Sequence, residues 1–530
     1  MEKCLSLINK TTLAKGALRM KLYSLLQSIE LLESWNERDV EIRGLAYNSK
    51  DVKPGDLFIC IKGSKADGHD YIQQAIEKGA VAVIVEDYQE IDIPQFRVRD
   101  SRKVLANLSH NYYGRPSEKM KVIGITATNG KTSTSFMVNS ILESYSIKTG
   151  LIGTVMVKYG GFIEPAILTT PESLDLQRHF AQMNRKGVSH VVMEVSSSAL
   201  ELNRVDEVDF DIVTLNNIGR EHIDLHTSFE KYFEYKASLI RKAKPKAWAI
   251  LNLDCPYSKS LIAETKARVL TIGVKDKTGD LSCSNLDLST GRPKFTVHIR
   301  NPIKLDNIEY QPQEFSIDLS VPGFHSVYNS MVAISVGLLS GVPVPIIQEG
   351  LNSFKGVERR FQIIYDESFK IIDDHFANPE NINVTLETLS MMDYNDLHIV
   401  YAIRGSRGVI TNRENAKAIV RWASKLNIKE IIATLSRSHV TEKDRVRDEE
   451  IEVFKEIMDE ANIKVRLYDE LPDAISHGSS KVSKGDILLL AGCQGMDYGA
   501  KIVLEEIYKS KPNMDKKELF RALGNRIAGM

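Results

Sequence analysis

Short apolar runs alternate with amphipathic stretches along most of this 530-residue chain. Apolar runs at 121–126, 188–195, 211–215 and 247–251 are separated by stretches whose apolar residues recur at helical spacing. Strands that alternate with helices in this manner form a parallel sheet that crossover helices cover. The pattern predicts an α/β protein with a doubly wound parallel sheet at its centre.

Two further α/β units flank this central sheet. Upstream, short β-like runs surround a helical stretch at 71–78, and a helix at 101–113 is followed by Gly114 and Pro116, which indicate a linker. Shorter alternating segments at 268–320 predict an antiparallel subsheet inserted before a helix that begins near Val327. The downstream unit is predicted to be Rossmann-like, with strands at 369–374, 397–403, 429–434 and 486–492 and helices at 412–425 and 448–461.

These units set the expected domain boundaries. They are a basic extension at 1–19, a small α/β N-terminal domain at 20–117, a central domain at 118–358, a C-terminal domain at 359–512 and a charged tail at 513–530. We expect the chain beyond Lys509 to be mobile.

Composition narrows the class of protein. The chain is 43% hydrophobic and 26% charged, as folded domains are, and its net charge is −1. No overall field therefore attracts it to nucleic acid or to a membrane surface, and no apolar run is long enough to span a bilayer. The five cysteines are scattered and form no C-x-x-C pair. We expect a cytoplasmic monomer with no nucleic-acid or membrane partner.

A phosphate-binding loop lies between the first central strand and the helix that follows it. Residues 126–133 read T-A-T-N-G-K-T-S, in which the loop amides and the helix N-terminus would cradle phosphates. Lys131 would reach the β and γ oxygens, and the Thr132 hydroxyl would hold Mg²⁺. Five residues separate Gly124 from Gly130, whereas a strict Walker A motif has four, so that spacing is not met. A chance Gly-Lys-Thr in a turn is the alternative, and the flanking strand and helix argue against it.

This loop resembles the G-x-T-G-T-N-G-K-T loop of the Mur ligases, ATP-dependent enzymes that extend the cell-wall peptide. Further motifs resemble the E type of that family, which adds the third amino acid to UDP-N-acetylmuramoyl-L-alanyl-D-glutamate. Together these motifs cover about residues 20–358. The segment at 47–58 resembles the family's uridine-nucleotide segment, and those at 168–172 and 193–204 resemble its two substrate loops. The segment at 217–226 resembles its metal-binding strand end, and the one at 232–239 holds the lysine that the family carbamylates.

The resemblance implies a role for each matching residue. The residues that bind ATP would be Ala127, Thr128, Asn129, Gly130, Lys131, Thr132, Ser133, Asn329, Arg360 and Asp374. The residues that bind the UDP-linked muramoyl peptide or the amino acid would be Ser49, Thr169, Thr170, Ser196, Arg204, Arg407 and Arg437. Two Mg²⁺ ions would be held by Thr132, Glu194, His222 and Lys236, the last as a CO₂-derived carbamate. The catalytic set would be Lys131, Lys236, His222 and Glu194.

Three of the four metal-site assignments have a simpler alternative. Glu194 could merely cap a helix, although a carboxylate at the carboxyl end of a parallel strand lies in the usual ligand crevice. His222 could be a solvated loop histidine. Lys236 could be a surface lysine with its stem against the aromatic residues of Y-F-E-Y-K. Its place among the other motifs favours carbamylation, which requires a neutral amine and therefore burial.

The C-terminal third departs from the family pattern. At the hinge motif V-x-G-R-x-E, Arg359 replaces Gly and Gln362 replaces Glu; Ala377 replaces His in D-Y-A-H-N-P-D. Diaminopimelate-adding enzymes carry T-S-D-N-P-R and G-K-G-H-E where this chain has T-L-S-R-S-H at 434–439 and G-C-Q-G-M-D at 492–497. Ala127 and Ser326 also replace a family Gly and Asn. The amino-acid end of the site is therefore expected to be unusual.

These observations predict an amide ligase that activates a substrate carboxylate as an acyl phosphate before an amine displaces phosphate. The open alternatives are a related ligase acting on another UDP-linked or pseudomurein-type acceptor, a glutamate-chain ligase, and a nucleotide-binding regulatory homologue that has lost ligation. Folylpolyglutamate synthase is disfavoured because it lacks the first domain. The presence of Lys131, Glu194, His222 and Lys236 argues against loss of activity.

Overall fold

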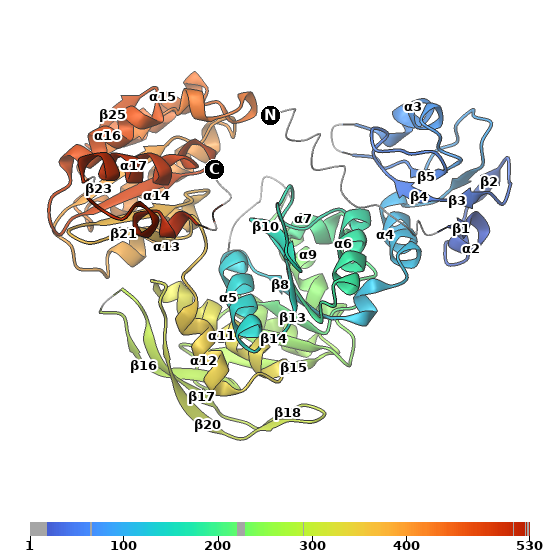
Figure 1. The fold of residues 1–530 in the computed structure, drawn as a ribbon, viewed down its shortest axis with the longest axis horizontal. Coiled ribbons are helices and arrows are strands. Elements are labelled where there is room, and N and C mark those ends of the chain that lie inside the picture. The colour runs from blue at the N-terminus through green and yellow to red at the C-terminus, as the bar shows by residue number, and fades with distance from the viewer. Residues whose placement is uncertain are drawn as a thin grey trace.

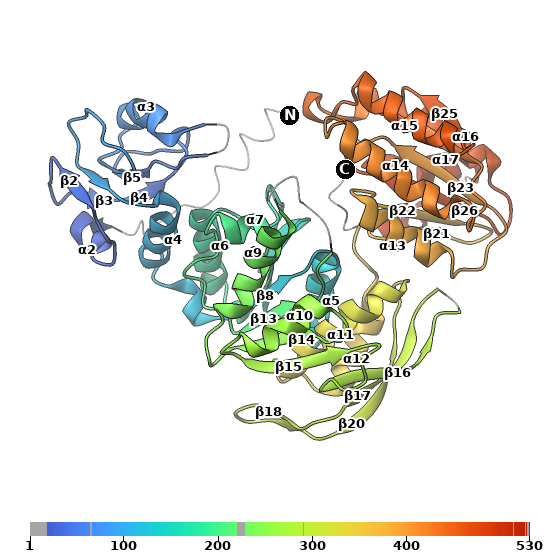
Figure 2. The same ribbon diagram turned by 180° about the vertical axis from the view of Figure 1, so that it is seen from behind.

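The computed structural model describes residues 19–63, 66–219, 228–289, 291–511, 513–524, 526 and 529. These residues form three large sheets that follow one another along the chain and lie in an arc, with the central sheet between the other two (Figure 1). Figure 2 shows the same arrangement from behind. Within the described part of the chain, no helix is long and apolar enough to cross a membrane.

The N-terminal sheet has five strands in the order β2-β7-β6-β5-β4, parallel except for the antiparallel pair β2 and β7. The strands are β2 (Glu33–Trp35), β4 (Gly44–Ala46), β5 (Asp56–Ile59), β6 (Ala82–Val85) and β7 (Gln95–Arg97), with a separate pair β1 (Met20–Lys21) and β3 (Glu41–Ile42). The helices are α2 (Leu22–Leu26), α3 (Ile72–Glu77) and α4 (Ser101–Tyr112). The helices predicted at 71–78 and 101–113 are thus present.

The central sheet has eleven strands in the order β11-β10-β9-β12-β8-β13-β14-β15-β16-β17-β20. They are β8 (Lys121–Thr126), β9 (Thr149–Ile152), β10 (Met156–Tyr159), β11 (Phe162–Pro165), β12 (His190–Glu194), β13 (Ile212–Leu215), β14 (Trp248–Asn252), β15 (Arg268–Gly273), β16 (Leu281–Asp287), β17 (Lys294–Ile299) and β20 (Gln313–Asp318). The strands from β9 to β16 in this order are parallel, and those at both edges are antiparallel.

The antiparallel strands predicted at 268–320 are present, but they do not form a separate subsheet. Strand β16 pairs in parallel with β15, so the hydrogen-bonded ladder continues without a break into β17 and β20. Only the short hairpin of β18 (Ile303–Lys304) and β19 (Glu309–Tyr310) stands apart. The predicted antiparallel strands are confirmed, whereas their continuity with the parallel sheet was not predicted, because periodicity identifies strands but not their partners.

Helices cover both faces of the central sheet. One face carries α5 (Lys131–Ser144), α11 (Phe324–Leu339) and α12 (Val344–Ser353), and the other carries α6 (Ser173–Arg185), α7 (Ser197–Glu201) and α9 (Phe229–Arg241), with α10 (Pro256–Ser260) nearby. Helix α11 begins three residues before the predicted Val327. Gly323, at φ +94°, ends the preceding segment and starts the helix.

The C-terminal sheet has six strands in the order β21-β22-β26-β23-β24-β25, parallel except for β21. They are β21 (Gln362–Asp366), β22 (Lys370–Asp374), β23 (Leu397–Ala402), β24 (Glu430–Thr434), β25 (Lys464–Tyr468) and β26 (Ile487–Gly492). The helices are α13 (Pro379–Leu389), α14 (Val409–Ala423), α15 (Asp448–Glu460), α16 (Leu471–Lys481) and α17 (Gly499–Ser510). The parallel, Rossmann-like sheet is as predicted.

The chain beyond Lys509 is not a free tail where it is described. It forms α18 (Lys516–Leu519) and a 3₁₀ turn at Arg521–Leu523, whose Leu519 and Leu523 are buried in the core beneath α17. Arg526 is 5% exposed and pairs with Asp373. The expectation of a mobile tail was wrong, because a few apolar residues among many charged ones are enough to dock a short segment.

Candidate active site

The predicted phosphate loop is the turn between β8 and α5. Gly130 has φ +89°, and a Cβ there would fall 2.2 Å from the Asn329 Oδ1 atom, so glycine is required. Asn217 fixes the loop from the neighbouring strand end: its carbonyl accepts from Thr128 N at 2.9 Å, and its amide exchanges two hydrogen bonds of 2.9 Å with the Asn129 backbone. Ala127 is buried in this turn and does not have a positive φ, so its Cβ is accommodated where the family has glycine.

Two lysines meet at one carbonyl oxygen of this loop. Lys131 Nζ donates to Ala127 O at 2.8 Å and to Thr128 O at 2.9 Å. Lys236 Nζ, from α9, donates to the same Ala127 O at 2.8 Å and to Thr126 Oγ1 at 3.2 Å. Lys236 is 1% exposed and lies 5.0 Å from the centroid of the Tyr232 ring. It is therefore a buried lysine and not the solvated surface residue that its local sequence suggests.

Glu194 ends the central strand β12 and is fully buried. Its carboxylate accepts from Thr132 Oγ1 at 3.0 Å, and from Thr154 N and Oγ1 at 2.8 and 3.0 Å. A Cβ at Gly153 would fall 2.3 Å from its Oε1 atom, so this approach also requires glycine. The carboxylate does not cap a helix: Ser196 caps α7.

The substrate-loop residues lie beside this carboxylate. Thr170 Oγ1 donates to Glu194 O at 2.8 Å and accepts from Ser196 N at 3.1 Å. Thr169 Oγ1 lies 3.1 Å from Thr154 Oγ1, and Arg204 Nη1 donates to Thr170 O at 3.3 Å. The structure thus joins the phosphate loop, Glu194 and the loop at 168–172 into one hydrogen-bonded site at the carboxyl edge of the central sheet, the usual place for ligands.

The remaining predicted site residues lie farther out or outside the described residues. Ser49 is buried in the N-terminal domain, where its Oγ donates to Gln74 Oε1 at 2.5 Å. Arg407 and Arg437, in loops after β23 and β24, are paired with acids of their own domain, Asp444 at 3.1 Å and Asp469 at 2.8 Å. His222 falls at 220–227, outside the described residues.

The C-terminal domain approaches the phosphate loop through α13. Asn381 Nδ2, in the first turn of that helix, donates to Asn129 Oδ1 at 2.9 Å. The predicted ATP ligand Asp374 ends β22; burial raises the pKa of its carboxyl, which accepts from Phe361 N at 2.7 Å and from the Thr385 hydroxyl. Asn381 was not among the predicted site residues. Thr154, which contacts Glu194, and Asn217, which holds the phosphate loop, were not predicted in these roles either. Thr154 and Asn217 lie two residues past the ends of β9 and β13, and Asn381 lies in the first turn of α13. Polar residues just past strand ends or at helix starts are the signal that could have found them.

Arg359 explains the altered hinge motif. It has φ +54°, a conformation that favours the glycine of the family, yet its side chain is 4% exposed. The guanidinium pairs with Asp373 at 3.4 Å and with Asp497, and donates to the carbonyls of Gly492 and Cys493. This side chain therefore fills the space beneath the loop at 492–497.

We expect Arg359→Gly to destabilise the protein although glycine suits the backbone there. Relief of the positive φ is worth about 1 kcal/mol, whereas leaving Asp373 and Asp497 without this partner costs about 3 kcal/mol or more. Urea unfolding measures the difference. Asn427→Gly, at an exposed position with φ +54°, is the matched control and should change stability by less than about 1 kcal/mol. A variant Arg359→Gly as stable as the control would show that the ion pairs contribute nothing.

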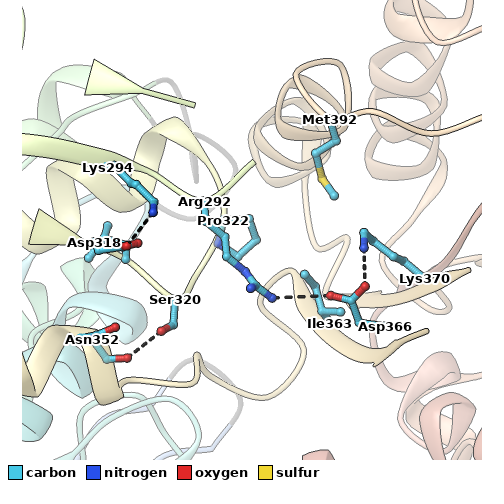
Figure 3. Close-up of a pocket in the computed structure, with 11 residues that line it drawn as sticks. Arg292, Lys294, Asp318, Ser320, Pro322, Asn352, Ile363, Asp366, Lys370 and Met392 are labelled. Atoms are coloured by element: carbon cyan, nitrogen blue, oxygen red, sulfur yellow. Dashed lines mark hydrogen bonds and ion pairs between the residues drawn. The ribbon is translucent and has the colours of Figure 1, made fainter. Parts of the chain in front are cut away.

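A cavity of about 400 Å³ lies away from this site, between the edge of the central sheet and the C-terminal sheet (Figure 3). Arg292 reaches Asp366 across the boundary at 3.6 Å, and Lys370 pairs with the same carboxylate. Its lining includes none of the predicted site residues. The cavity is therefore a feature of the domain boundary and not the candidate active site.

The fold and the loop define a nucleotide-binding α/β protein, and comparisons with known proteins identify the class. Residues 41–113 match the Mur ligase family catalytic domain, residues 125–337 the Mur ligase middle domain, and residues 359–494 the Mur ligase glutamate ligase domain. The chain belongs to the Mur ligase family and is an ATP-dependent amide ligase.

Two curated relatives carry the name UDP-N-acetylmuramoyl-L-alanyl-D-glutamate–2,6-diaminopimelate ligase. The one from Caldanaerobacter subterraneus subsp. tengcongensis is 33% identical over 89% of this chain and 94% of its own length. The one from Alkaliphilus metalliredigens is 34% identical over 89% of this chain and 92% of its own. Among solved structures, MurF ligase from Thermotoga maritima in complex with ADP is similar in fold, with a TM-score of 0.61 and 22% identity over 88% of this chain and 97% of that one.

Proposed function

We propose that this enzyme adds an amino acid to UDP-N-acetylmuramoyl-L-alanyl-D-glutamate through an acyl-phosphate intermediate, a step of peptidoglycan precursor synthesis. The observation that carries the proposal is the continuous site formed by Lys131, Glu194 and Thr170, which links the phosphate loop to the substrate loop through hydrogen bonds of 2.8 to 3.1 Å. The curated relatives named for this acceptor support it.

In the proposed reaction, the γ-phosphoryl group of ATP passes to the terminal substrate carboxylate, and ADP leaves. The amine of the incoming amino acid then attacks the acyl carbon, the C–N bond forms, inorganic phosphate leaves and the amine loses a proton. Lys131 and the amides that follow Gly130 hold the phosphates, and Arg204 with Thr169, Thr170 and Ser196 orients the acceptor. Positioning and charge neutralisation provide most of the rate in phosphoryl transfer.

The site has donors that fit Mg²⁺. Thr132 Oγ1 and a Glu194 oxygen lie 3.0 Å apart, and both are hard oxygen donors of the kind that Mg²⁺ prefers. The described residues contain no cluster of three or more His, Cys, Asp or Glu side chains that could hold a metal, which suits an ion whose other ligands are water and phosphate oxygens. Bound there, Mg²⁺ would neutralise charge on the transferring phosphoryl group. His222 would contribute to a second ion.

Lys236 is proposed to act as a carbamate. Its neutral amine would attack CO₂, forming an N–C bond and releasing a proton, which converts a cation into a carboxylate-like anion. The shared acceptor supports this assignment, because two ammonium groups that donate to one carbonyl oxygen repel each other in a buried site. A carbamate on Lys236 would remove that repulsion and supply an anionic oxygen at the phosphate loop, next to Thr126 and Ala127.

The direct test combines purified protein with ATP, UDP-N-acetylmuramoyl-L-alanyl-D-glutamate and a panel of amino acids, with phosphate release and product mass as the readouts. Phosphate release that depends on both the nucleotide acceptor and one amino acid is expected. Turnover only with a different UDP-linked acceptor would replace the proposed acceptor. Absence of any ligation with all acceptors would favour the regulatory alternative.

We expect the added amino acid not to be meso-diaminopimelate, although the names of the curated relatives specify 2,6-diaminopimelate. In this chain the Asp497 carboxylate pairs with Arg359, the Arg437 guanidinium pairs with Asp469, and Ser438 N donates to Glu470. These groups stand where the family grips the distal amino-carboxylate end, and such polar grips discriminate strongly. Arg407 and Arg437 remain candidates for the α-carboxylate that every amino acid carries.

An equimolar competition of meso-diaminopimelate, L-lysine, L-ornithine, L-alanine and D-glutamate, with products read by mass, measures this preference. A product other than the diaminopimelate adduct should predominate by at least about tenfold. A predominant diaminopimelate product would refute the prediction and would mean that other residues of this domain provide the grip.

A further inference from the structure

Three charged side chains meet where the N-terminal domain touches the central domain. Glu172, at the end of the substrate loop, accepts from Arg102 Nη1 at 3.1 Å and pairs with Arg204 Nη2 at 3.0 Å. Arg102 comes from α4 of the N-terminal domain, and the side chains of Arg102, Glu172 and Arg204 are 19%, 14% and 10% exposed. Helices α4 and α6 lie side by side at this junction in both views (Figures 1 and 2).

Glu172 occupies the N-cap position of α6, but its side chain makes no capping hydrogen bond. A carboxylate at that position ordinarily stabilises the helix start. Here one oxygen faces each guanidinium instead, so two arginines share a single partly buried carboxylate. The cluster therefore keeps one net positive charge beside the substrate loop.

Arg204 has unused capacity within this cluster. Its Nη1 donates to Thr170 O at 3.3 Å, while its buried Nε has no hydrogen-bond partner among the residues that the structure describes. The substrate loop is held on its other side by Thr169 and Thr170, which contact Thr154 and Glu194. Arg204 thus carries a buried donor without a partner among the described residues, beside the substrate loop, where the proposed function puts an anionic acceptor.

We infer that Arg102 is a positioning residue that acts on Arg204 through Glu172 and sets the affinity for the UDP-linked acceptor without touching it. This inference rests on the proposed function. With Arg102 present, Glu172 divides its charge between two guanidinium groups, and Arg204 keeps positive charge for the ligand. Without Arg102, Glu172 pairs with Arg204 alone, which neutralises Arg204 and loosens the end of the loop.

The domain junction has other contacts that should keep an Arg102 variant folded. Tyr47 Oη donates to Asp175 Oδ2 at 2.6 Å, and Leu174 of α6 is buried in the core of the N-terminal domain. Lys103, the next residue of α4, is exposed and offers a matched control, because its replacement removes the same charge from the same helix.

The test compares steady-state kinetics of Arg102→Ala, Arg102→Lys and Lys103→Ala. For Arg102→Ala, the KM for UDP-N-acetylmuramoyl-L-alanyl-D-glutamate should rise about tenfold while kcat and the KM for ATP stay within about twofold, the size of effect that residues without ligand contact produce. Arg102→Lys should recover part of the loss, and Lys103→Ala should behave as wild type. In a Glu172→Gln background, Arg102→Ala should have little further effect, because the two residues act as one unit.

Hydrogen exchange of the free protein separates this inference from the proposed function. If the wild-type enzyme does not use that acceptor, the proposed function has failed, and amide exchange at 168–172 decides whether Arg102 positions the loop. Faster exchange in Arg102→Ala than in Lys103→Ala would support the coupling. Equal exchange and equal KM in the two variants, or a fall in kcat with KM unchanged, would overturn the inference.

Discussion

Ligation should fall by at least about 100-fold in kcat when Lys131 is replaced by alanine. The Nζ group holds the carbonyls of Ala127 and Thr128 at 2.8 and 2.9 Å, so it both shapes the loop and places a cation where phosphate would bind. Loss of one such preorganised charge typically costs about 3 to 4 kcal/mol of transition-state stabilisation. Coupled phosphate release at saturating ATP measures the effect.

Lys121→Ala provides the control for this variant. Lys121 is a half-buried lysine on β8 whose Nζ donates to the Leu339 carbonyl at 3.4 Å, on the same strand that leads to the loop. It should retain most of the activity, and circular dichroism should show both variants folded. A Lys131→Ala enzyme that ligates at near wild-type rate would mean that the phosphate site lies elsewhere.

The second large effect is expected at Lys236, where alanine should leave almost no activity. If this residue acts as a carbamate, its replacement removes an anion, and short carboxylic acids such as formate or acetate should restore part of the rate. An ammonium group could not be replaced by an acid in this way. The buried position, 1% exposed, limits rescue to small acids.

Lys242→Ala is the matched control, because this lysine is exposed at the end of the same helix and pairs with Asp206 at 3.3 Å. It should be fully active and insensitive to added acid. Native mass spectrometry at raised CO₂ should detect an adduct on the wild type that Lys236→Ala lacks. An active Lys236→Ala enzyme, together with no labile adduct on the wild type, would exclude the carbamate.

Much of the fold and of the nucleotide site depends on local pattern, and that part could be predicted from the sequence. The strand, turn and helix around Lys131 follow from apolar periodicity and from the Gly-Lys-Thr of the loop, and the structure has all three elements. Glu194 could be placed at the ligand edge because it ends an apolar strand of the parallel sheet. The three α/β units follow for the same reason, since each is made of consecutive elements.

Contacts between distant segments were decided only by the tertiary structure. Lys236 looks like a surface lysine in its own helix, and only packing against β8 buries it next to Lys131. Arg102, Glu172 and Arg204 come from two domains, and Arg359 with Asp373 and Asp497 joins the start and end of the C-terminal domain. A sequence pattern reports the periodicity of a single helix or strand. These charged side chains pair across elements because a buried charge without a partner is energetically costly, and that pairing depends on the tertiary structure.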